Sequence, residues 1–322
     1  MKLFCFRIRT FICLSQLLFS CLFLNAKDKP LNLLLITVDD MSCDSVGVYG
    51  CELEGTTPTM DRLASQSLRF KHAHVTVGNC NPCRNVMFSG LISHNNKVEG
   101  FYKVTDPGWP HMVDLLQDVG YYAGIHGKVT HSSPYQPYGW DDDLTISPTG
   151  KKAHIKDAKA YGESTSRGIE NAEKAGKPFF LSINISDPHK PFWSQVRGGG
   201  EDPYVPSRIY TAEEVPVPGF LFEDPEVREE LALYYSSVRR ADDCLNEVLK
   251  ALRKSGQWEN TMIVFLSDHG MPLPFAKTQL YHHSTHTPLM VRLPGTTKAG
   301  KLESRHMVSV LDLLPTVMDS LA

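Results

Sequence analysis

Residues 31–40 of the chain read LNLLLITVDD: a run of eight mostly apolar positions followed by two aspartates. An apolar run that does not alternate with polar residues is typical of a strand buried on both faces of a parallel sheet. In such sheets the carboxyl ends of the strands share one crevice, where sites form. We therefore expect a buried strand that delivers Asp39 and Asp40 to the edge of a parallel sheet.

Further apolar runs predict more strands, at residues 121–125, 179–185, 262–266 and 289–293. Between them, residues 226–254 carry apolar side chains at three- and four-residue spacings, which predicts one long helix ended by Ser255-Gly256. A shorter helix is expected from Thr57 to about Gln66, with Pro58 in its first turn. Strands that alternate with helices predict an α/β fold: a doubly wound, mainly parallel sheet with helices on both faces.

Two long segments, residues 132–156 and 188–224, are rich in Gly, Pro and aromatic residues. We expect both to be loops at the strand ends, where binding sites of α/β proteins usually lie. Residues 308–321 are amphipathic and close the chain at Ala322.

The first 26 residues have the shape of a signal peptide. Lys2, Arg7 and Arg9 precede an apolar stretch from Phe11 to Leu24, and Ala26 ends a plausible cleavage site. The alternative is a lipoprotein signal, because LFSC at residues 18–21 resembles a lipobox. Either signal predicts export to a periplasmic, extracellular or lysosomal-type compartment. No later run reaches the roughly 18–20 apolar residues that span a bilayer.

The mature chain is acidic. Cleavage after Ala26 would remove three positive charges and change the net charge from −3 to −6. This balance argues against a nucleic-acid partner held by bulk charge. It does not exclude a polyanionic sugar, because a pocket can be locally basic.

Five cysteines remain after that cleavage, at positions 43, 51, 80, 83 and 244. An odd number cannot pair completely within one chain, although an exported protein meets conditions that permit disulfides. Cys43 and Cys51 are either the nearest disulfide pair or two free, small apolar residues.

Residues 80–90 read CNPCRNVMFSG, which fits Cys-x-Pro-x-Arg, four further residues and a hydroxyl-Gly pair. This pattern resembles the maturation signature of the type I sulfatases, whose cysteine is oxidised to Cα-formylglycine. The resemblance implies that Cys80 is the precursor of an aldehyde whose hydrate attacks sulfur. Arg84 lies one helical turn after Cys80 if a helix begins there, and it would place a fixed cation beside the nucleophile. Cys83 stands where Ser or Ala is commoner, and a disulfide at Cys83 would compete with maturation.

Acidic residues also follow a second predicted strand, since residues 262–266 lead into Ser267-Asp268-His269-Gly270. Three carboxylates that converge at one sheet edge repel one another unless a cation lies between them. Oxygen donors favour Ca²⁺ or Mg²⁺ over zinc. The alternative interpretation is that Asp39-Asp40 only caps a following helix.

From about Asn32 to its end the chain resembles the formylglycine-dependent sulfatases of the alkaline phosphatase superfamily. The resemblance implies an alkaline-phosphatase-like fold and one Ca²⁺ ion. The ligands that it implies are Asp39, Asp40, Asp268, His269 and the modified Cys80. Of these His269 is the weakest, because imidazole is an unusual ligand for calcium.

Three further segments resemble the sulfate-binding and proton-transfer segments of the family. They are GKVTH with Lys128 and His131, DPHKP with His189, and PFAKT with Lys277. The family resemblance implies that Lys128 and His131 face the sulfate and that Lys277 bridges the sulfate and the formylglycine. It also implies that His189 or His131 protonates the leaving group. Nearby, Tyr281, His282, His283 and His286 either line the pocket or are structural.

The segment from Ser267 to Tyr281 looks closest to the heparan N-sulfatase branch, whereas GKVTH and THTPL also resemble the iduronate-2-sulfatase branch. Both imply a sulfated carbohydrate substrate derived from glycosaminoglycan, with N-sulfate slightly favoured over O-sulfate. They also imply a maturation enzyme as a partner. Family members usually continue into a smaller C-terminal domain with an antiparallel sheet, so we expect residues 30–322 to form a catalytic domain truncated at its C-terminus.

Two other functions remain open. A phosphohydrolase of the same superfamily would share the sheet and the acidic strand ends but would carry Ser or Thr at position 80. An unmatured chain that binds sulfated glycans without turnover would keep an unmodified Cys80.

Overall fold

The computed structural model describes residues 29–102, 104, 107–132 and 139–322, so the predicted signal peptide and its alternative, the lipobox, lie outside the described residues. Contacts divide the chain at Leu31, and residues 32–322 form the unit described below. Among the described residues no helix combines the length and apolarity that crossing a bilayer requires.

Eight strands form one sheet in the order β4-β3-β5-β1-β6-β7-β2-β8. Their bounds are β1 Asn32–Asp39, β2 Leu68–His74, β3 Tyr122–His126, β4 Asp142–Asp143, β5 Phe179–Pro188, β6 Thr261–Ser267, β7 Leu289–Arg292 and β8 Leu302–Ser309. All neighbouring strands run parallel except β7, which is antiparallel to both β6 and β2. The predicted mainly parallel sheet is confirmed.

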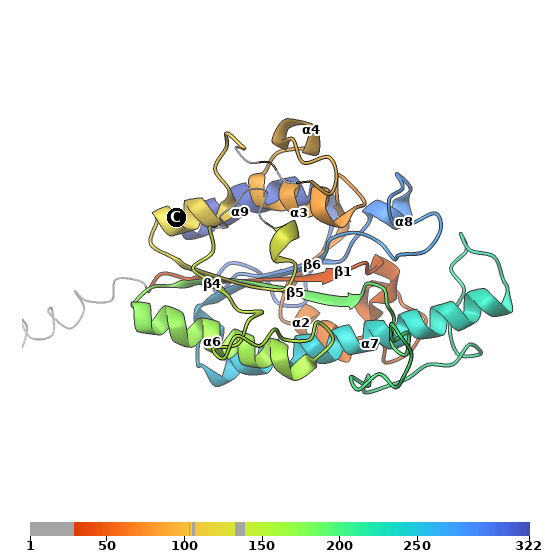
Figure 1. Ribbon diagram of the computed structural model, residues 1–322. Coiled ribbons are helices and arrows are strands. Elements are labelled where there is room, and N and C mark those ends of the chain that lie inside the picture. The colour runs from red at the N-terminus through yellow and green to blue at the C-terminus, as the bar shows by residue number, and fades with distance from the viewer. Residues whose placement is uncertain (1–28, 103, 105–106, 133–138) are drawn as a thin grey trace, which may run out of the picture. The chain divides into compact units, whose positions relative to one another are not determined.

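Helices cover both faces of this sheet (Figure 1). One face carries α2 Pro58–Ala64, α6 Ala158–Ala175 and α7 Pro225–Lys254; the other carries α3 Cys80–Ser89, α5 Met112–Asp118 and α9 Leu313–Leu321. Short helices are α4 Ser93–Asn96 and α8 His282–Thr285, and the 3-10 turns are Cys43–Ser45, Gly47–Tyr49, Val129–His131, Trp258–Asn260 and Val310–Asp312. The predicted long helix is α7, which Pro225 begins with Asp224 as its N-cap.

Strand β1 lies at the centre of the sheet and explains the unbroken apolar run. Its eight residues are all buried. Leu34, Ile36 and Val38 pack with α6 and α7, while Leu33 and Leu35 pack with α3, α5 and α9. Because successive side chains of a strand point to opposite faces, two covered faces demand apolar residues at every position.

The register of β1 places its end between two other strand ends. Val38 lies opposite Ile185 of β5 and opposite Ser267 of β6. The residues that follow β1, β5 and β6 therefore leave the sheet at the same edge, as parallel strands require.

The five cysteines at positions 43, 51, 80, 83 and 244 are free thiols in the structure. The interpretation of Cys43 and Cys51 as free residues therefore holds, and the disulfide is not formed. Cys83 is fully buried among apolar side chains of α3 and the sheet. It is packed away from a pairing partner and does not compete with Cys80 through a disulfide.

Candidate active site

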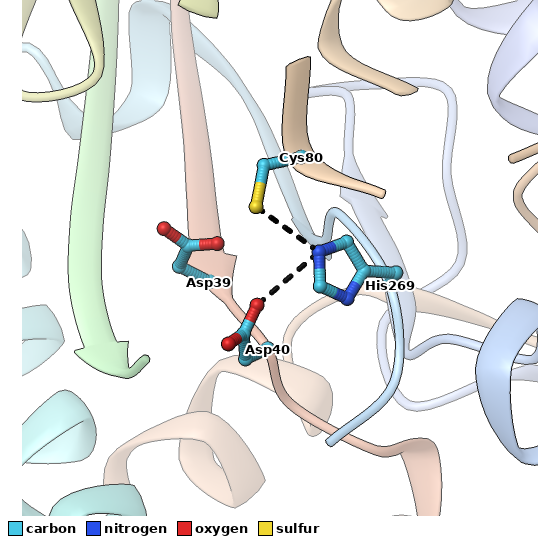
Figure 2. A group of neighbouring side chains, drawn as sticks. All are labelled: Asp39, Asp40, Cys80 and His269. Carbon is cyan, nitrogen blue, oxygen red and sulfur yellow. Dashed lines mark hydrogen bonds and ion pairs between the residues drawn. The ribbon is translucent and has the colours of Figure 1, made fainter. Parts of the chain in front are cut away.

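Four predicted site residues converge at the carboxyl edge of the sheet (Figure 2). Asp39 and Asp40 come from the end of β1, Cys80 begins α3, and His269 follows β6. One potential ligand atom from each of these buried residues lies within 4.8 Å of those of the other three. The Nε2 atom of His269 is 3.3 Å from the Cys80 Sγ atom and 3.2 Å from Oδ1 of Asp40.

The backbone of Asp40 explains how two consecutive aspartates reach one site. In a continued strand their side chains would point to opposite faces of the sheet. Asp40 instead has a φ of 67°, in the left-handed region that Asp tolerates better than most residues. The chain turns at this residue, and both carboxylates join the same group.

Arg84 reaches the site from the next turn of α3 and is fully buried. Its Nε and Nη2 atoms each lie 3.0 Å from Oδ2 of Asp268. Its Nη1 atom donates to Thr37 Oγ1 at 2.8 Å and to Asn184 Oδ1 at 2.6 Å. Arg84 therefore ties the helix that carries Cys80 to the ends of β1, β5 and β6.

Each of the paired aspartates has a lysine partner. Lys128 forms an ion pair with Asp39, and Nζ of Lys277 lies 2.8 Å from Oδ1 and 2.9 Å from Oδ2 of Asp40. Lys128 is held there by the turn after β3, where Gly127 has a φ of 73° and a Cβ would lie 2.6 Å from the Asn184 carbonyl oxygen. A side chain at position 127 is excluded, and the turn aims Lys128 into the site.

These pairings give the two carboxyl groups different pKa values. Burial would raise the pKa of Asp39, but the charges of Lys128 and Arg84 outweigh it and hold that pKa well below its usual range. The pKa of Asp40 is raised by burial and by the charge of Asp39, against the opposing effect of His269 and Lys277. Asp39 is thus a permanent anion at neutral pH.

The donor set at this edge fits a hard divalent cation. Both carboxylate oxygens of Asp39 are buried without a hydrogen-bond partner among the described residues, apart from the ion pair with Lys128. The Nδ1 atom of His269 donates to the Gly270 carbonyl oxygen at 3.0 Å, which turns Nε2 toward Asp40 and Cys80. The Cys80 thiol completes this group of potential ligands.

Asp268 has a different position from the other predicted ligands. Its Oδ2 atom accepts from Arg84, its Oδ1 atom accepts from the Asp40 backbone N–H at 3.2 Å, and Oδ1 is 3.7 Å from Nε2 of His269. It borders the four-residue group without belonging to it. Its role as a ligand stays a prediction.

The two predicted proton-transfer residues lie at the rim of this group. Burial, together with the charges of Lys128 and Arg84, lowers the pKa of His131 to about 4, and its Nδ1 atom is buried without a hydrogen-bond partner among the described residues. His189 and Lys128 line a cavity of about 740 Å³. This volume is within the usual range for small-molecule sites.

The cavity is formed by the two segments predicted as loops at the strand ends. Its wall includes His154, Lys156, His189, Arg197 and Tyr204. A larger hollow of about 1300 Å³ between α6 and α7 is lined by none of the predicted site residues. Lys128 also lines a second cavity of about 490 Å³ with Thr130 and Trp140, but of these two only the cavity of about 740 Å³ has both Lys128 and His189 in its wall.

Sequence reasoning missed the buried charges beneath this cavity. Asp187 accepts from Lys156 at 2.6 Å and from Arg240 of α7 at 2.6 Å, and Arg240 also donates to Asp202 at 2.8 Å. Lys156 donates to the His189 carbonyl oxygen at 2.7 Å. The network fixes the backbone of His189. Its signal in the sequence is Arg240, a charged residue on the buried face of the predicted long helix.

Tyr281, His282, His283 and His286 do not appear in the wall of the cavity. Three of them contact a different set of side chains: His282 and His286 lie beside His74, and His283 stacks on Phe220 at 4.0 Å.

Residues 31–321 match the sequence profile of the Sulfatase family, and the chain belongs to that family. Human N-sulphoglucosamine sulphohydrolase is 31% identical to it over 311 residues, covering 90% of this chain and 61% of the relative. Arylsulfatase K from Gallus gallus is 26% identical over 299 residues, covering 78% of this chain and 56% of the relative. The chain thus spans about three fifths of the length of these relatives.

Solved structures share the fold. A protein solved in complex with its substrate D-glucosamine-2-N,6-O-disulfate superposes with a TM-score of 0.70 at 19% identity, covering 91% of this chain and 77% of that protein. This likeness shows that the two proteins share the same α/β architecture.

Proposed function

We propose that this chain is a sulfatase that hydrolyses a sulfate ester or sulfamate on a glycosaminoglycan-derived sugar, with N-sulfoglucosamine as the favoured substrate. The observation that carries the proposal is the position of Cys80. It begins a buried helix, faces two carboxylates and an imidazole, and belongs to a Cys-x-Pro-x-Arg sequence whose Arg84 is held at the same edge. The family membership and the N-sulphoglucosamine sulphohydrolase relative support the choice of reaction and sugar.

The proposal includes oxidation of Cys80 to Cα-formylglycine by a maturation enzyme. Burial and the charges of Asp39, Asp268 and Asp40 raise the pKa of the Cys80 thiol. Since the thiolate is the nucleophilic form of cysteine, this environment opposes ordinary thiol catalysis. Hydrated formylglycine would supply one hydroxyl that attacks sulfur and a second whose deprotonation allows sulfate to leave.

Asp39, Asp40, Asp268 and His269 would hold one Ca²⁺ ion beside residue 80. Bound there, the ion would supply positive charge that favours an ionised hydroxyl and a bound anion. The acidic donors fit this role better than the imidazole of His269 does.

The chain's own cations would receive the sulfate group. Lys128 and Lys277 reach the site from opposite sides, on Asp39 and Asp40 respectively, and each has an exposed part of its side chain to offer. A sulfuryl group needs donors on its oxygens because negative charge develops there. Arg84 keeps its guanidinium beside residue 80 through four contacts and would hold the nucleophile rather than the sugar.

His189 is the better candidate for the acid that protonates the leaving atom. It lines the cavity in which the sugar would lie, and its backbone is fixed by Lys156. With a pKa of about 4, His131 is neutral at physiological pH and carries no proton to give as an imidazolium. We assign His131 to hydrogen bonding of the sulfate.

The test is sulfate release by the purified, matured protein in the presence of Ca²⁺. Heparin-type disaccharides that carry only an N-sulfate are compared with disaccharides that carry only a 2-O-sulfate, and Cys80→Ala is the matched control. Release from the N-sulfated sugar that Cys80→Ala abolishes supports the proposal. Release confined to the 2-O-sulfated sugar replaces the substrate but keeps the reaction. Binding of both sugars without release, by a protein whose residue 80 has the mass of formylglycine, overturns the proposal in favour of a glycan-binding protein.

A further inference from the structure

Three histidines from two separate segments meet on the surface beside the candidate active site. His74 ends β2, while His282 and His286 bound the short helix α8. Their ring centroids are 5.7 Å apart for His74 and His282, 5.2 Å for His74 and His286, and 4.6 Å for His282 and His286. We propose that these three imidazoles form a binding site for one divalent transition-metal ion, with Zn²⁺ as the best fit.

The ring separations suit such a site. Zinc–nitrogen bonds of about 2.0–2.1 Å at tetrahedral angles place the centroids of coordinated imidazoles roughly 5 Å apart. The interplanar angles of 68°, 34° and 35° show that no two of the rings are stacked in parallel. Among the described residues only the Asp39 group has ligand atoms within 4.8 Å of one another, so the three histidine side chains must shift toward one another to bind one ion.

The backbone brings the three residues together independently of any ion. The N–H of His286 donates to the His282 carbonyl oxygen at 2.8 Å, so these two side chains lie one helical turn apart. His74 and His286 face each other across an antiparallel bridge. Two adjacent hydrogen bonds, Val75 N to Thr285 O at 2.8 Å and Thr287 N to Ala73 O at 3.1 Å, hold α8 against the end of β2.

The hydrogen bonds of the rings leave nitrogens available for a metal. Nε2 of His286 lies 2.8 Å from the Lys71 carbonyl oxygen, which can only accept. That bond places the proton on Nε2 and leaves the lone pair on Nδ1, the arrangement in which a metal-ligating histidine donates its other N–H to a carbonyl. Nδ1 of His74 lies 3.4 Å from the hydroxyl of Thr285, and when Nδ1–H donates to that oxygen the lone pair for the ion is on Nε2.

The chemistry of this donor set separates it from the acidic group at Asp39. Imidazole nitrogens select zinc, nickel, copper or cobalt, whereas carboxylates select calcium or magnesium. His282 is exposed and gives the ion a path from solvent.

His74 precedes Cys80 by six residues and His282 follows Lys277 by five. A bound ion would therefore fasten together the two segments that lead to Cys80 and from Lys277.

The experiment is zinc titration of the purified protein in saturating Ca²⁺, followed by a chromophoric zinc indicator in competition. Variants His282→Gln and His286→Gln are compared with His94→Gln, whose exposed imidazole pairs with Glu99 elsewhere on the surface. We expect one zinc ion per chain in the parent and in His94→Gln. Loss of one imidazole ligand should weaken binding at least about tenfold.

Cys80→Ala provides the second comparison, because zinc could also enter the thiol-containing group at Asp39. Zinc binding that survives in Cys80→Ala and is weakened in His282→Gln supports the proposal. Binding that is lost in Cys80→Ala but unchanged in His282→Gln assigns the ion to the Asp39 group and overturns it. So does a parent protein that binds no zinc at 100-fold excess. Because His282 is exposed, His282→Gln should keep the parent's far-ultraviolet circular dichroism, which is recorded for every variant.

Discussion

Replacement of Arg84 by Met should destabilise the protein strongly, and the structure allows the size of the effect to be worked out. Arg84 and Asp268 are both fully buried, and two guanidinium nitrogens lie 3.0 Å from one carboxylate oxygen. Loss of the guanidinium leaves the carboxylate with the Asp40 N–H at 3.2 Å as its remaining hydrogen bond. Removing one partner of a buried pair typically costs about 3–5 kcal/mol, because the other charge stays desolvated. We expect a decrease of about 4 kcal/mol in the free energy of unfolding.

The variant Asp268→Asn distinguishes two causes of instability in Arg84→Met: an uncompensated charge on Asp268, and the loss of the packing contacts of the Arg84 side chain. If the penalty comes from an uncompensated charge, Arg84→Met together with Asp268→Asn should be more stable than the sum of the single effects, by roughly 2 kcal/mol. Lys250→Met is the control, because Lys250 and Glu247 form an exposed ion pair at 2.7 Å. Such surface pairs typically contribute less than about 1 kcal/mol.

The assay is urea unfolding followed by tryptophan fluorescence, first in a chelator and then in Ca²⁺. Each variant is measured at the same pH, and its midpoint and slope are both recorded. The reasoning would be refuted if the free energy of unfolding of Arg84→Met lay within about 1 kcal/mol of that of the parent. Loss of the cation beside a desolvated carboxylate should cost more than this. Strict additivity in the double variant would refute it as well.

Three further predictions concern pH, metal and turnover. Burial lowers the pKa of His111 to about 3. The unfolded chain therefore takes up a proton below about pH 6.5 that the folded protein excludes, and stability should fall by about 2 kcal/mol between pH 7 and 5. The variant His111→Asn keeps a side-chain acceptor at the helix N-cap and should lose that slope in urea titrations at the two pH values. Ca²⁺ should raise the melting temperature of the parent but not of Asp39→Asn, as differential scanning fluorimetry would show; an equal rise in both would remove Asp39 from the proposed site. Lys277→Met should lower kcat for sulfate release about 100-fold and should also lower the urea midpoint, because buried Asp40 loses its lysine partner; an unchanged kcat in the folded variant would exclude Lys277 from the chemistry.

The parts of the fold that the sequence predicted are those with a strong local pattern. Strand β1 has an unbroken apolar run because both of its faces are covered, and α7 repeats apolar residues along one face over 30 residues. Strands β2 and β8 were missed because most of their side chains are partly or fully exposed. Their sequences, LRFKHAH and LESRHMVS, lack the apolar content by which a buried strand is found.

Helix α6 was missed for a different reason. Most of its buried residues are small (Ala160, Ser164, Thr165, Gly168 and Ala172), and Tyr161 and Ile169 are the two large ones. A Cβ at Gly168 would lie 2.7 Å from the side chain of Leu181, and one at Gly162 would lie 3.2 Å from the Glu247 carbonyl oxygen. Glycine lowers intrinsic helix propensity, so the requirement for close approach hides the helix from local sequence patterns.

The same distinction between local patterns and distant contacts applies to the residues of the site. The residues that converge at the strand ends were predicted from motifs and from the rule that parallel strands end together. Their partners were not, because each depends on a contact between distant segments. Arg84 meets Asp268 from 184 residues away, and Thr37 and Asn184 complete its shell from two other strands. The sequence indicates such pairs only weakly, by a polar residue near the end of an apolar run.

The charges of the assembled site would favour the joint binding of the proposed cation and a sulfate anion. Three carboxylates, Asp39, Asp40 and Asp268, lie against three permanent cations, Arg84, Lys128 and Lys277. The protein alone is therefore locally balanced. A sulfate ion, the product of the proposed reaction, would add two negative charges, and a divalent cation would add two positive ones. Either alone would unbalance a buried group in a medium of low dielectric constant, so each should favour the binding of the other. Burial, and after it the charge of Asp39, raise the pKa of Asp40, and a bound cation beside both carboxylates would oppose this rise.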